Sequence, residues 1–153
     1  VEVYNTIDSK EIKEIFPELF KSKFVVGNWY KSETGAIANH QGGNKGYGCD
    51  VFGIWHDDIW NWDPKFWEPA TRQEVLEMFK KEAIKRGFKN GVRYVDFYKT
   101  TFSLIDFDGL YLSYDLMGLS DGNGAIFQNG VWAEILPCEK TIKEQIIELL
   151  KQL

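Results

Sequence analysis

The sequence has few of the residue types that build covalent or metal-bound scaffolds. Its 153 residues include only two cysteines, Cys49 and Cys138, and two histidines, His40 and His56. Two cysteines supply neither a disulfide framework nor a four-cysteine zinc site, and two histidines are too few for the histidine-rich centres of metallophosphohydrolases. We therefore expect neither a resident metal nor a cofactor.

Long apolar runs and an excess of positive charge are also missing. No run approaches the roughly 20 apolar residues of a membrane-spanning helix, and the first residues, VEVYNTIDSKE, lack a basic segment followed by an apolar one. Eighteen Lys and Arg stand against 23 Asp and Glu, giving a net charge of −5, whereas duplex nucleic acid binds basic surfaces. The expected location is the cytoplasm, with neither a membrane nor a duplex as partner.

Signatures of common catalytic chemistry are sparse. The glycine-rich stretch 42–48 lacks the Gly-Lys-Ser/Thr ending of a P-loop. The segment that starts at Asp106 begins like a calcium-binding loop, but it lacks the glutamate that such a loop has at position 12. His56, Asp57 and Asp58 leave one catalytic alternative open, a small metal-dependent hydrolase, although adjacent strand residues point to opposite faces. We expect the protein not to be an enzyme.

Aromatic residues, by contrast, are abundant at 16%, and five of the six tryptophans lie between residues 29 and 67. This concentration exceeds what the core of one small domain needs, and it favours a wall on which a planar ligand stacks or a protein partner is anchored. Basic side chains would contact a phosphate. The candidate ligand-binding residues are Lys31, Lys45, Tyr47, Trp55, His56, Trp60, Trp62, Trp67 and Arg72.

Two capping boxes predict helices. Thr71–Glu74 has the Thr-x-x-Glu pattern, apolar residues then recur every three or four positions, and Gly87 suits a C-terminal cap, so we expect a helix over 72–86. The same pattern at Thr141–Glu144 predicts a second helix over 142–152.

The segments 24–67 and 88–136 are rich in β-branched and aromatic residues and are interrupted by glycine. Four dipeptides are typical of tight hairpin turns: Asn90-Gly91, Asp108-Gly109, Asp121-Gly122 and Asn129-Gly130. The predicted fold class is α+β, with two small antiparallel meander or barrel-like units and helices between and beside them.

An internal duplication is suggested by a constant spacing. Phe24, Gly27 and Tyr30 recur as Phe88, Gly91 and Tyr94, each pair 64 residues apart. Each unit alone is too small to bury a sufficient core, so we expect one compact body over 1–153. Its expected parts are 1–70, with a short helix near Asp8 before the first β unit, and 71–153, with the second β unit and the C-terminal helix.

Five segments resemble small uncharacterised proteins of tailed phages and prophages. They are FVVGNWYK (24–31), GYG (46–48), EPATRQEV (68–75), KRGFKNGV (85–92) and QNGVWAEI (128–135). These segments mark strand starts, turns and helix caps, and no established activity or site is carried over with them. The resemblance implies an accessory protein that acts in a bacterial cytoplasm during infection.

Three functions follow as hypotheses. The leading one is a non-catalytic binding protein with an anti-defence role, which sequesters a small planar, nucleotide-like ligand in an aromatic pocket. The second is a protein–protein interaction module that masks a host factor and exposes a contiguous apolar patch. The third is the hydrolase that uses His56. Symmetric self-association is compatible with each.

Overall fold

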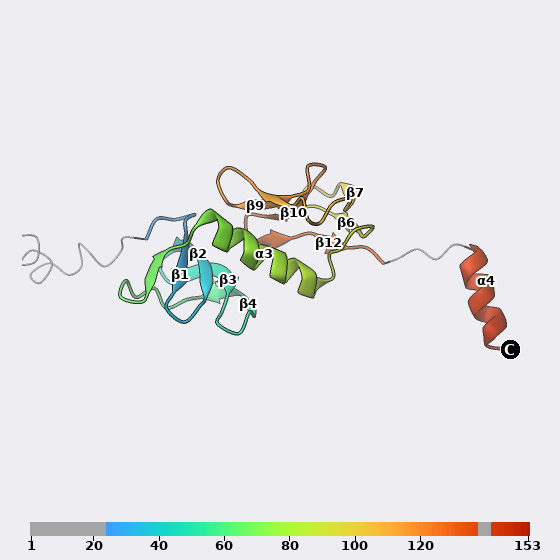
Figure 1. Cartoon of the computed structure of the whole chain (residues 1–153), viewed down its shortest axis with the longest axis horizontal. Coiled ribbons are helices and arrows are strands. Elements are labelled where there is room, and N and C mark those ends of the chain that lie inside the picture. Colours follow the sequence, from blue (N-terminus) through green and yellow to red (C-terminus); the bar gives the residue numbers. More distant parts are fainter. Residues whose placement is uncertain (1–23, 138–141) are drawn as a thin grey trace, which may run out of the picture. The chain divides into compact units, whose positions relative to one another are not determined.

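The computed structural model describes residues 24–137 and 142–153, so the helix expected near Asp8 lies outside the described residues. The described residues form two helices and twelve strands, and the strands pair antiparallel in three sheets (Figure 1). The predicted α+β class is confirmed. The sheets are open, so the barrel-like form of the prediction is wrong.

Contacts between residues divide the chain into two compact units. The first contains residues 24–82 together with Tyr114–Leu116, and the second contains 83–113 and the residues from Met117 onward. The segment 114–116 is joined to the first unit by Trp29, whose Nε1 donates a hydrogen bond to the Leu116 carbonyl at 2.7 Å. The boundary thus falls inside a helix, 12 residues beyond the expected position after residue 70.

The first unit is built on a five-stranded sheet of order β4-β3-β2-β1-β5. Four consecutive strands form a meander, and the fifth pairs with the opposite edge of β1 instead of closing on β4. β4 therefore remains an edge strand. The bounds are β1 Trp29–Ser32, β2 Ile37–Gly42, β3 Lys45–Cys49, β4 Trp55–Ile59 and β5 Trp67–Pro69.

Helix α3 (Arg72–Arg86) has the bounds that the capping box and Gly87 predict. Its cap is reciprocal: the Glu74 N–H donates to Thr71 Oγ1 at 3.2 Å, and the Thr71 N–H donates to Glu74 Oε1 at 3.1 Å. Val75 and Phe79 are fully buried, and the Phe79 ring lies 5.1 Å from that of Trp29 on β1. The first turns of α3 therefore cover one face of the five-stranded sheet.

The second unit contains a four-stranded sheet of order β11-β10-β9-β8 and a three-stranded sheet of order β12-β6-β7. The turn between β10 and β11 is Asn129-Gly130, and both residues have positive φ, 47° and 89°, as the sequence predicts. The bounds are β6 Arg93–Val95, β7 Thr101–Ser103, β8 Tyr111–Leu112, β9 Gly118–Ser120, β10 Ala125–Gln128, β11 Val131–Trp132 and β12 Glu134–Ile135.

The 64-residue spacing recurs in the backbone of the two units. β1 pairs with β2 through Trp29↔Asn39 and Tyr30↔Ala38, and β6 pairs with β7 through the residues 64 positions later, Arg93↔Ser103 and Tyr94↔Phe102. The turns between these strands correspond too. In the first unit, Ser32 accepts hydrogen bonds from the N–H groups of Gly35 and Ala36. In the second unit, Asp96 accepts hydrogen bonds from the N–H groups of Lys99 and Thr100.

The residues at the start of the two corresponding segments have similar geometry. Gly27 and Gly91 have φ of 89° and 88°, conformations that a side chain rarely adopts. Phe24 meets Tyr30 edge-on, with ring planes at 90°, and Phe88 meets Tyr94 at 76°. The correspondence therefore covers strands, turns and packing over some 17 residues, from Phe24 to His40 and from Phe88 to Leu104.

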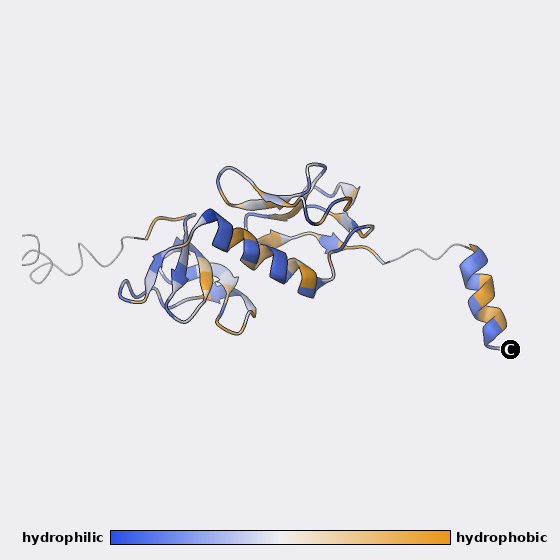
Figure 2. Cartoon of the chain, in the orientation of Figure 1, coloured by the Kyte–Doolittle hydropathy of each residue, from blue (hydrophilic) through white to orange (hydrophobic). Residues whose placement is uncertain are grey.

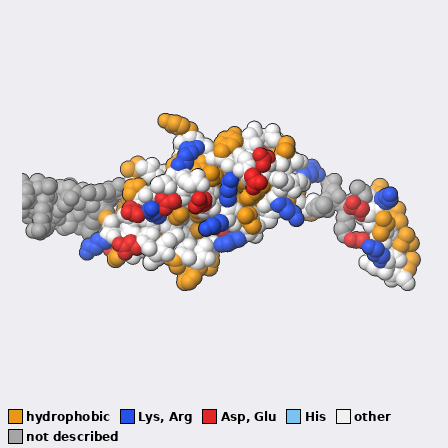
Figure 3. All heavy atoms as spheres, viewed as in Figure 1, with side chains coloured by type: hydrophobic (Ala, Val, Ile, Leu, Met, Phe, Trp, Pro, Cys, Tyr) orange, Lys and Arg blue, Asp and Glu red, His pale blue; other side chains and the backbone are white. Residues whose placement is uncertain are grey.

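Helix α4 (Ile142–Lys151) begins as predicted and has no buried residue. Its apolar residues lie along one side of the helix (Figure 2), and Figure 3 shows their side chains gathered there. In the part of the chain that the structure describes, no helix is long and apolar enough to cross a membrane.

Candidate ligand-binding face

The five-stranded sheet has aromatic side chains on both faces, and strand register and ring contacts assign each one to a face. On the face under α3, the Tyr47 ring lies 5.5 Å from Trp29 and 5.9 Å from Trp55, and Trp55 lies 6.3 Å from Phe79. This cluster is the packed core between sheet and helix. Trp55 and Tyr47, two of the predicted ligand-binding residues, therefore belong to the core face.

The opposite face carries a second cluster, here called the aromatic face, made of His40, Trp60, Trp62 and Trp67. Its floor is formed by small residues, of which Ala38 is fully buried and Gly46 lies beneath two indoles. A Cβ on Gly46 would lie 2.8 Å from Trp62 and 3.1 Å from Trp60. The glycine thus allows both rings to rest directly on the sheet backbone.

The three indoles of the aromatic face contact one another. The Trp62 and Trp67 ring centroids are 4.8 Å apart, and those of Trp60 and Trp67 are 5.9 Å apart. Trp60 is 9% exposed, whereas Trp62 and Trp67 are half-buried. The segment that follows β4 therefore folds back over the sheet and leaves part of two indoles open to solvent.

Two indole N–H groups of this face are satisfied by backbone carbonyls. Trp67 Nε1 donates to the Asn61 carbonyl at 2.8 Å, and Trp62 Nε1 donates to the Lys45 carbonyl at the longer distance of 3.3 Å. These bonds hold Trp67 firmly and Trp62 more weakly, because N–H···O bonds weaken as they lengthen beyond about 3 Å.

Two polar atoms of the aromatic face are buried without a hydrogen-bond partner among the described residues. They are Nδ1 of His40 and Nε1 of Trp60. His40 is 5% exposed and lies between the rings of Phe24, 5.6 Å away, and Trp62, 4.9 Å away. Burial lowers the pKa of the His40 imidazole and so favours its neutral form. Orphaned buried polar atoms are rare and costly in folded proteins.

His40 was not among the residues that the sequence singled out. A signal was present, because the 64-residue spacing aligns His40 with Leu104, an apolar residue. A polar side chain at one of two equivalent positions marks a difference between the units. The difference between His40 and Leu104 points to a site only once the strand register shows that the two positions correspond.

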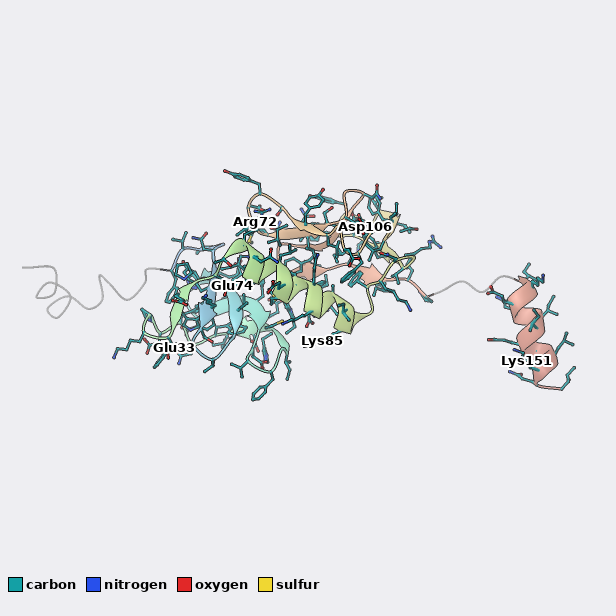
Figure 4. All side chains as sticks on the ribbon, in the orientation of Figure 1. Glu33, Arg72, Glu74, Lys85, Asp106 and Lys151 are labelled. Carbon is teal, nitrogen blue, oxygen red and sulfur yellow. The ribbon has the colours of Figure 1, made fainter. Side chains whose placement is uncertain are left out.

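The predicted cationic residues do not assemble at the aromatic face. Lys31 makes ion pairs with Glu74, at 2.9 Å, and Glu68, at 3.5 Å, and α3 supplies Glu74 from the core side of the sheet. Figure 4 shows Arg72 and Glu74 at the start of α3. Lys45 meets the face through its carbonyl, which accepts from Trp62.

These ion pairs set the ionisation of Glu74. The Lys31 ammonium and the Thr71 N–H and hydroxyl groups lower the pKa of Glu74 to about 2. Its carboxylate is therefore ionised at neutral pH, and it balances the charge of Lys31. A phosphate would have to compete with two carboxylates for this lysine.

His56 is engaged by Asp50. Its Nε2 lies 2.8 Å from Asp50 Oδ2, while Oδ1 of Asp50 accepts from the N–H groups of Phe52 and Ile54, both at 2.9 Å. Asp50 thereby locks the β3–β4 hairpin. Among the described residues, no group of three or more His, Cys, Asp or Glu side chains is placed to hold a metal ion.

The hairpin that Asp50 locks displays apolar side chains to solvent. Phe52 is 81% exposed, and Val51 and Ile54 on either side of it are 44% and 55% exposed. A rigid turn that presents a large apolar side chain is typical of an anchor for a protein partner.

One further motif in the sequence resembles catalytic machinery. Gly118–Gly122 matches the Gly-x-Ser-x-Gly pattern of serine hydrolases, in which the serine sits on a strand-to-helix turn. Here Ser120 ends β9 in a strand-to-strand turn, where its Oγ donates to the Gly124 carbonyl at 2.9 Å and accepts from the Gly122 N–H. The motif is a turn that its own serine stabilises.

In comparisons with known proteins, the chain matches no family model, no curated protein and no solved structure.

Proposed function

We propose that the protein is a non-catalytic binding protein and that a planar, nucleotide-like ligand stacks on its aromatic face. Support comes from the half-buried indoles of Trp62 and Trp67, because exposed aromatic faces bind planar rings at about 1–3 kcal/mol per stacked base. The observation that carries the proposal is the pair of orphaned polar atoms on His40 and Trp60 beneath them.

The proposed role is sequestration. A protein that withholds a ligand needs affinity and no turnover. The resemblance of the sequence to phage accessory proteins supplies the context: an anti-defence protein in a bacterial cytoplasm that removes a nucleotide-like signal.

Tryptophan fluorescence tests this proposal, because the ligand stacks on indoles. The full chain is titrated with a panel of nucleosides and nucleotides up to millimolar concentration, and its melting temperature is followed in parallel. We expect quenching and a raised melting temperature with at least one ligand. Trp62→Leu should abolish both, whereas the control Trp132→Phe, in the second unit, should retain both. No response to any member of the panel would refute the proposal.

A second candidate function is favoured by the exposed hairpin of Val51, Phe52 and Ile54. In this function the protein masks a host factor by inserting Phe52 into an apolar pocket. Host proteins retained by the wild-type chain and lost with Phe52→Ser would support it. Identical retention by both chains would remove the hairpin as the contact.

We also propose that the two units derive from an internal duplication. The support is the shared register of β1–β2 and β6–β7 together with the paired conformations of Gly27 and Gly91. The spacing changes beyond these hairpins: β5 meets β1 through Tyr30↔Pro69, and β12 meets β6 through Tyr94↔Ile135, which is 66 residues after Pro69.

A further inference from the structure

We infer that the aromatic face recognises the edge of an uncharged planar heterocycle, of the nucleobase class, through His40 and Trp60, and that it does not recognise phosphate. This inference rests on the proposed function and narrows its ligand. A nucleoside should therefore bind at least as tightly as the corresponding triphosphate.

The first argument is that the fold does not need a histidine at position 40. The His40 N–H donates to the Asn28 carbonyl and its carbonyl accepts from Gly27, at 3.0 and 2.7 Å. Leu104, 64 residues later, makes the same two bonds with Val92 and Gly91, each at 2.8 Å, and is 1% exposed. An apolar side chain therefore satisfies this position in the second unit.

The second argument is the cost of the imidazole. Leaving a buried polar atom without a hydrogen bond destabilises a protein, and an apolar residue of suitable shape removes that cost. Both His40 Nδ1 and Trp60 Nε1 are in this condition, on the same face of one sheet. Two such atoms in one cluster indicate groups that a ligand completes.

The chemistry of the two atoms defines what completes them. An indole N–H can only donate a hydrogen bond, and a neutral imidazole accepts at one ring nitrogen and donates at the other. A ring edge that carries a carbonyl and an N–H satisfies Trp60 and His40 together. Nucleobases combine such an edge with a flat face that stacks on indole.

Access to these atoms depends on Trp62. Its ring meets that of His40 edge-on, with ring planes at 86°, and covers the imidazole. Trp62 is half-buried, and its only described indole hydrogen bond is the long one to Lys45. A turn of this side chain opens the route to His40, and the displaced indole then stacks on the entering ring.

The charges around the face argue against phosphate recognition. Strand register places Asp58 of β4 opposite Gly46, on the same side of the sheet as His40, and Asp58 is exposed. Lys31, by contrast, is held by Glu74 and Glu68. A carboxylate at the rim repels a phosphate group and has no such effect on an uncharged ring.

The experiment compares the four ribonucleosides with their triphosphates by fluorescence titration and calorimetry on the full chain. We expect nucleosides to bind at least as tightly as their triphosphates, at least tenfold weaker nucleoside binding by His40→Leu, and unchanged nucleoside binding by Lys45→Met. Trp60→Phe, which keeps a ring and removes the donor, should also lose at least fivefold. A cooperative unfolding transition in His40→Leu, at or above the wild-type melting temperature, shows that the fold is intact.

The possible failures are distinguishable. Triphosphates that bind more than tenfold tighter than nucleosides, or nucleoside binding that His40→Leu leaves unchanged, overturn the inference and leave the binding function standing. If neither nucleosides nor triphosphates bind the wild-type chain at millimolar concentration, the inference and the proposed function fall together.

Discussion

His40 and Leu104 occupy equivalent positions in the two units, and only one of them is polar. The N–H group of each residue donates a hydrogen bond to a turn, and its carbonyl accepts a hydrogen bond from the same turn. Each turn contains a glycine with φ near 90°. Leu104 completes an apolar core, whereas His40 brings a buried nitrogen that has no partner among the described residues. The two positions therefore share their backbone hydrogen bonds and differ in side-chain polarity.

The substitution His40→Leu should stabilise the protein. Removing an unsatisfied buried nitrogen is expected to raise the free energy of unfolding by about 1–3 kcal/mol at pH 7.5. Urea unfolding followed by tryptophan fluorescence measures this change. A loss of stability would show that the imidazole is satisfied in solution.

The same residue should make stability depend on pH. Burial places the pKa of His40 in the folded state below its value of 6.5 in the unfolded chain. As the pH falls below 6.5 the unfolded chain binds a proton that the folded chain resists, so stability decreases, by at most about 1.4 kcal/mol per pH unit. His40→Leu should remove this decrease between pH 6.5 and 5. His56, present in both chains, cancels in the comparison.

Adding a methyl group at Gly46 should disrupt the aromatic face. The Cβ would lie 2.6 Å from the Asn39 carbonyl oxygen and 2.8 Å from the Trp62 ring, so sheet and indole must both shift. We expect Gly46→Ala to cost about 1–3 kcal/mol and to change the fluorescence of the native state. The matched control is Gly43→Asn, because Gly43 has open space and a φ of 55° that asparagine tolerates. Equal effects of the two changes would contradict the packing described.

The cap of α3 can be separated into its two parts. Thr71→Ala removes the acceptor for the Glu74 N–H and should cost about 1 kcal/mol at neutral pH. The pKa of Glu74 is lowered from 4.5 to about 2. Its ionised carboxylate therefore contributes fully to the free energy of unfolding above pH 4.5, and this contribution is lost as the pH falls towards 2. Glu74→Gln should flatten this part of the acid-unfolding curve. An unaltered curve would mean that the ion pair with Lys31 does not persist in solution.

Two substitutions in the exposed hairpin should have different effects on the stability of the protein. Phe52 is 81% exposed, so Phe52→Ser should change the free energy of unfolding by no more than about 0.5 kcal/mol. Asp50→Ala, which removes the hydrogen bonds that lock the same turn, should destabilise the chain. Thermal unfolding of both variants decides whether the turn is rigid because of Asp50 or because of its apolar side chains.

Local signals predicted α3, the start of α4 and the Asn129-Gly130 turn correctly because they act over a few residues. A capping box fixes where α3 begins, and Asn129-Gly130 adopts the positive φ values of a hairpin turn whatever surrounds it. The spacing of Gly27 and Gly91 likewise anticipated a repeated backbone. The candidate site could not be predicted from such signals alone. The structure brings Trp60, Trp62 and Trp67 together on one face and places Trp55 and Tyr47 on the other.

The α+β class, the bounds of α3 and the conformation of the Asn129-Gly130 turn could be predicted from the sequence, because they depend on neighbouring residues in the chain. The three-dimensional fold was needed to show that Trp55 packs in the core while Trp60, Trp62 and Trp67 cover the opposite face. The reason is that the side of a sheet on which a residue lies depends on strand register, and the path of the segment after β4 depends on the glycine floor at Gly46. Both are contacts between residues distant in sequence, which spacing along the chain does not encode.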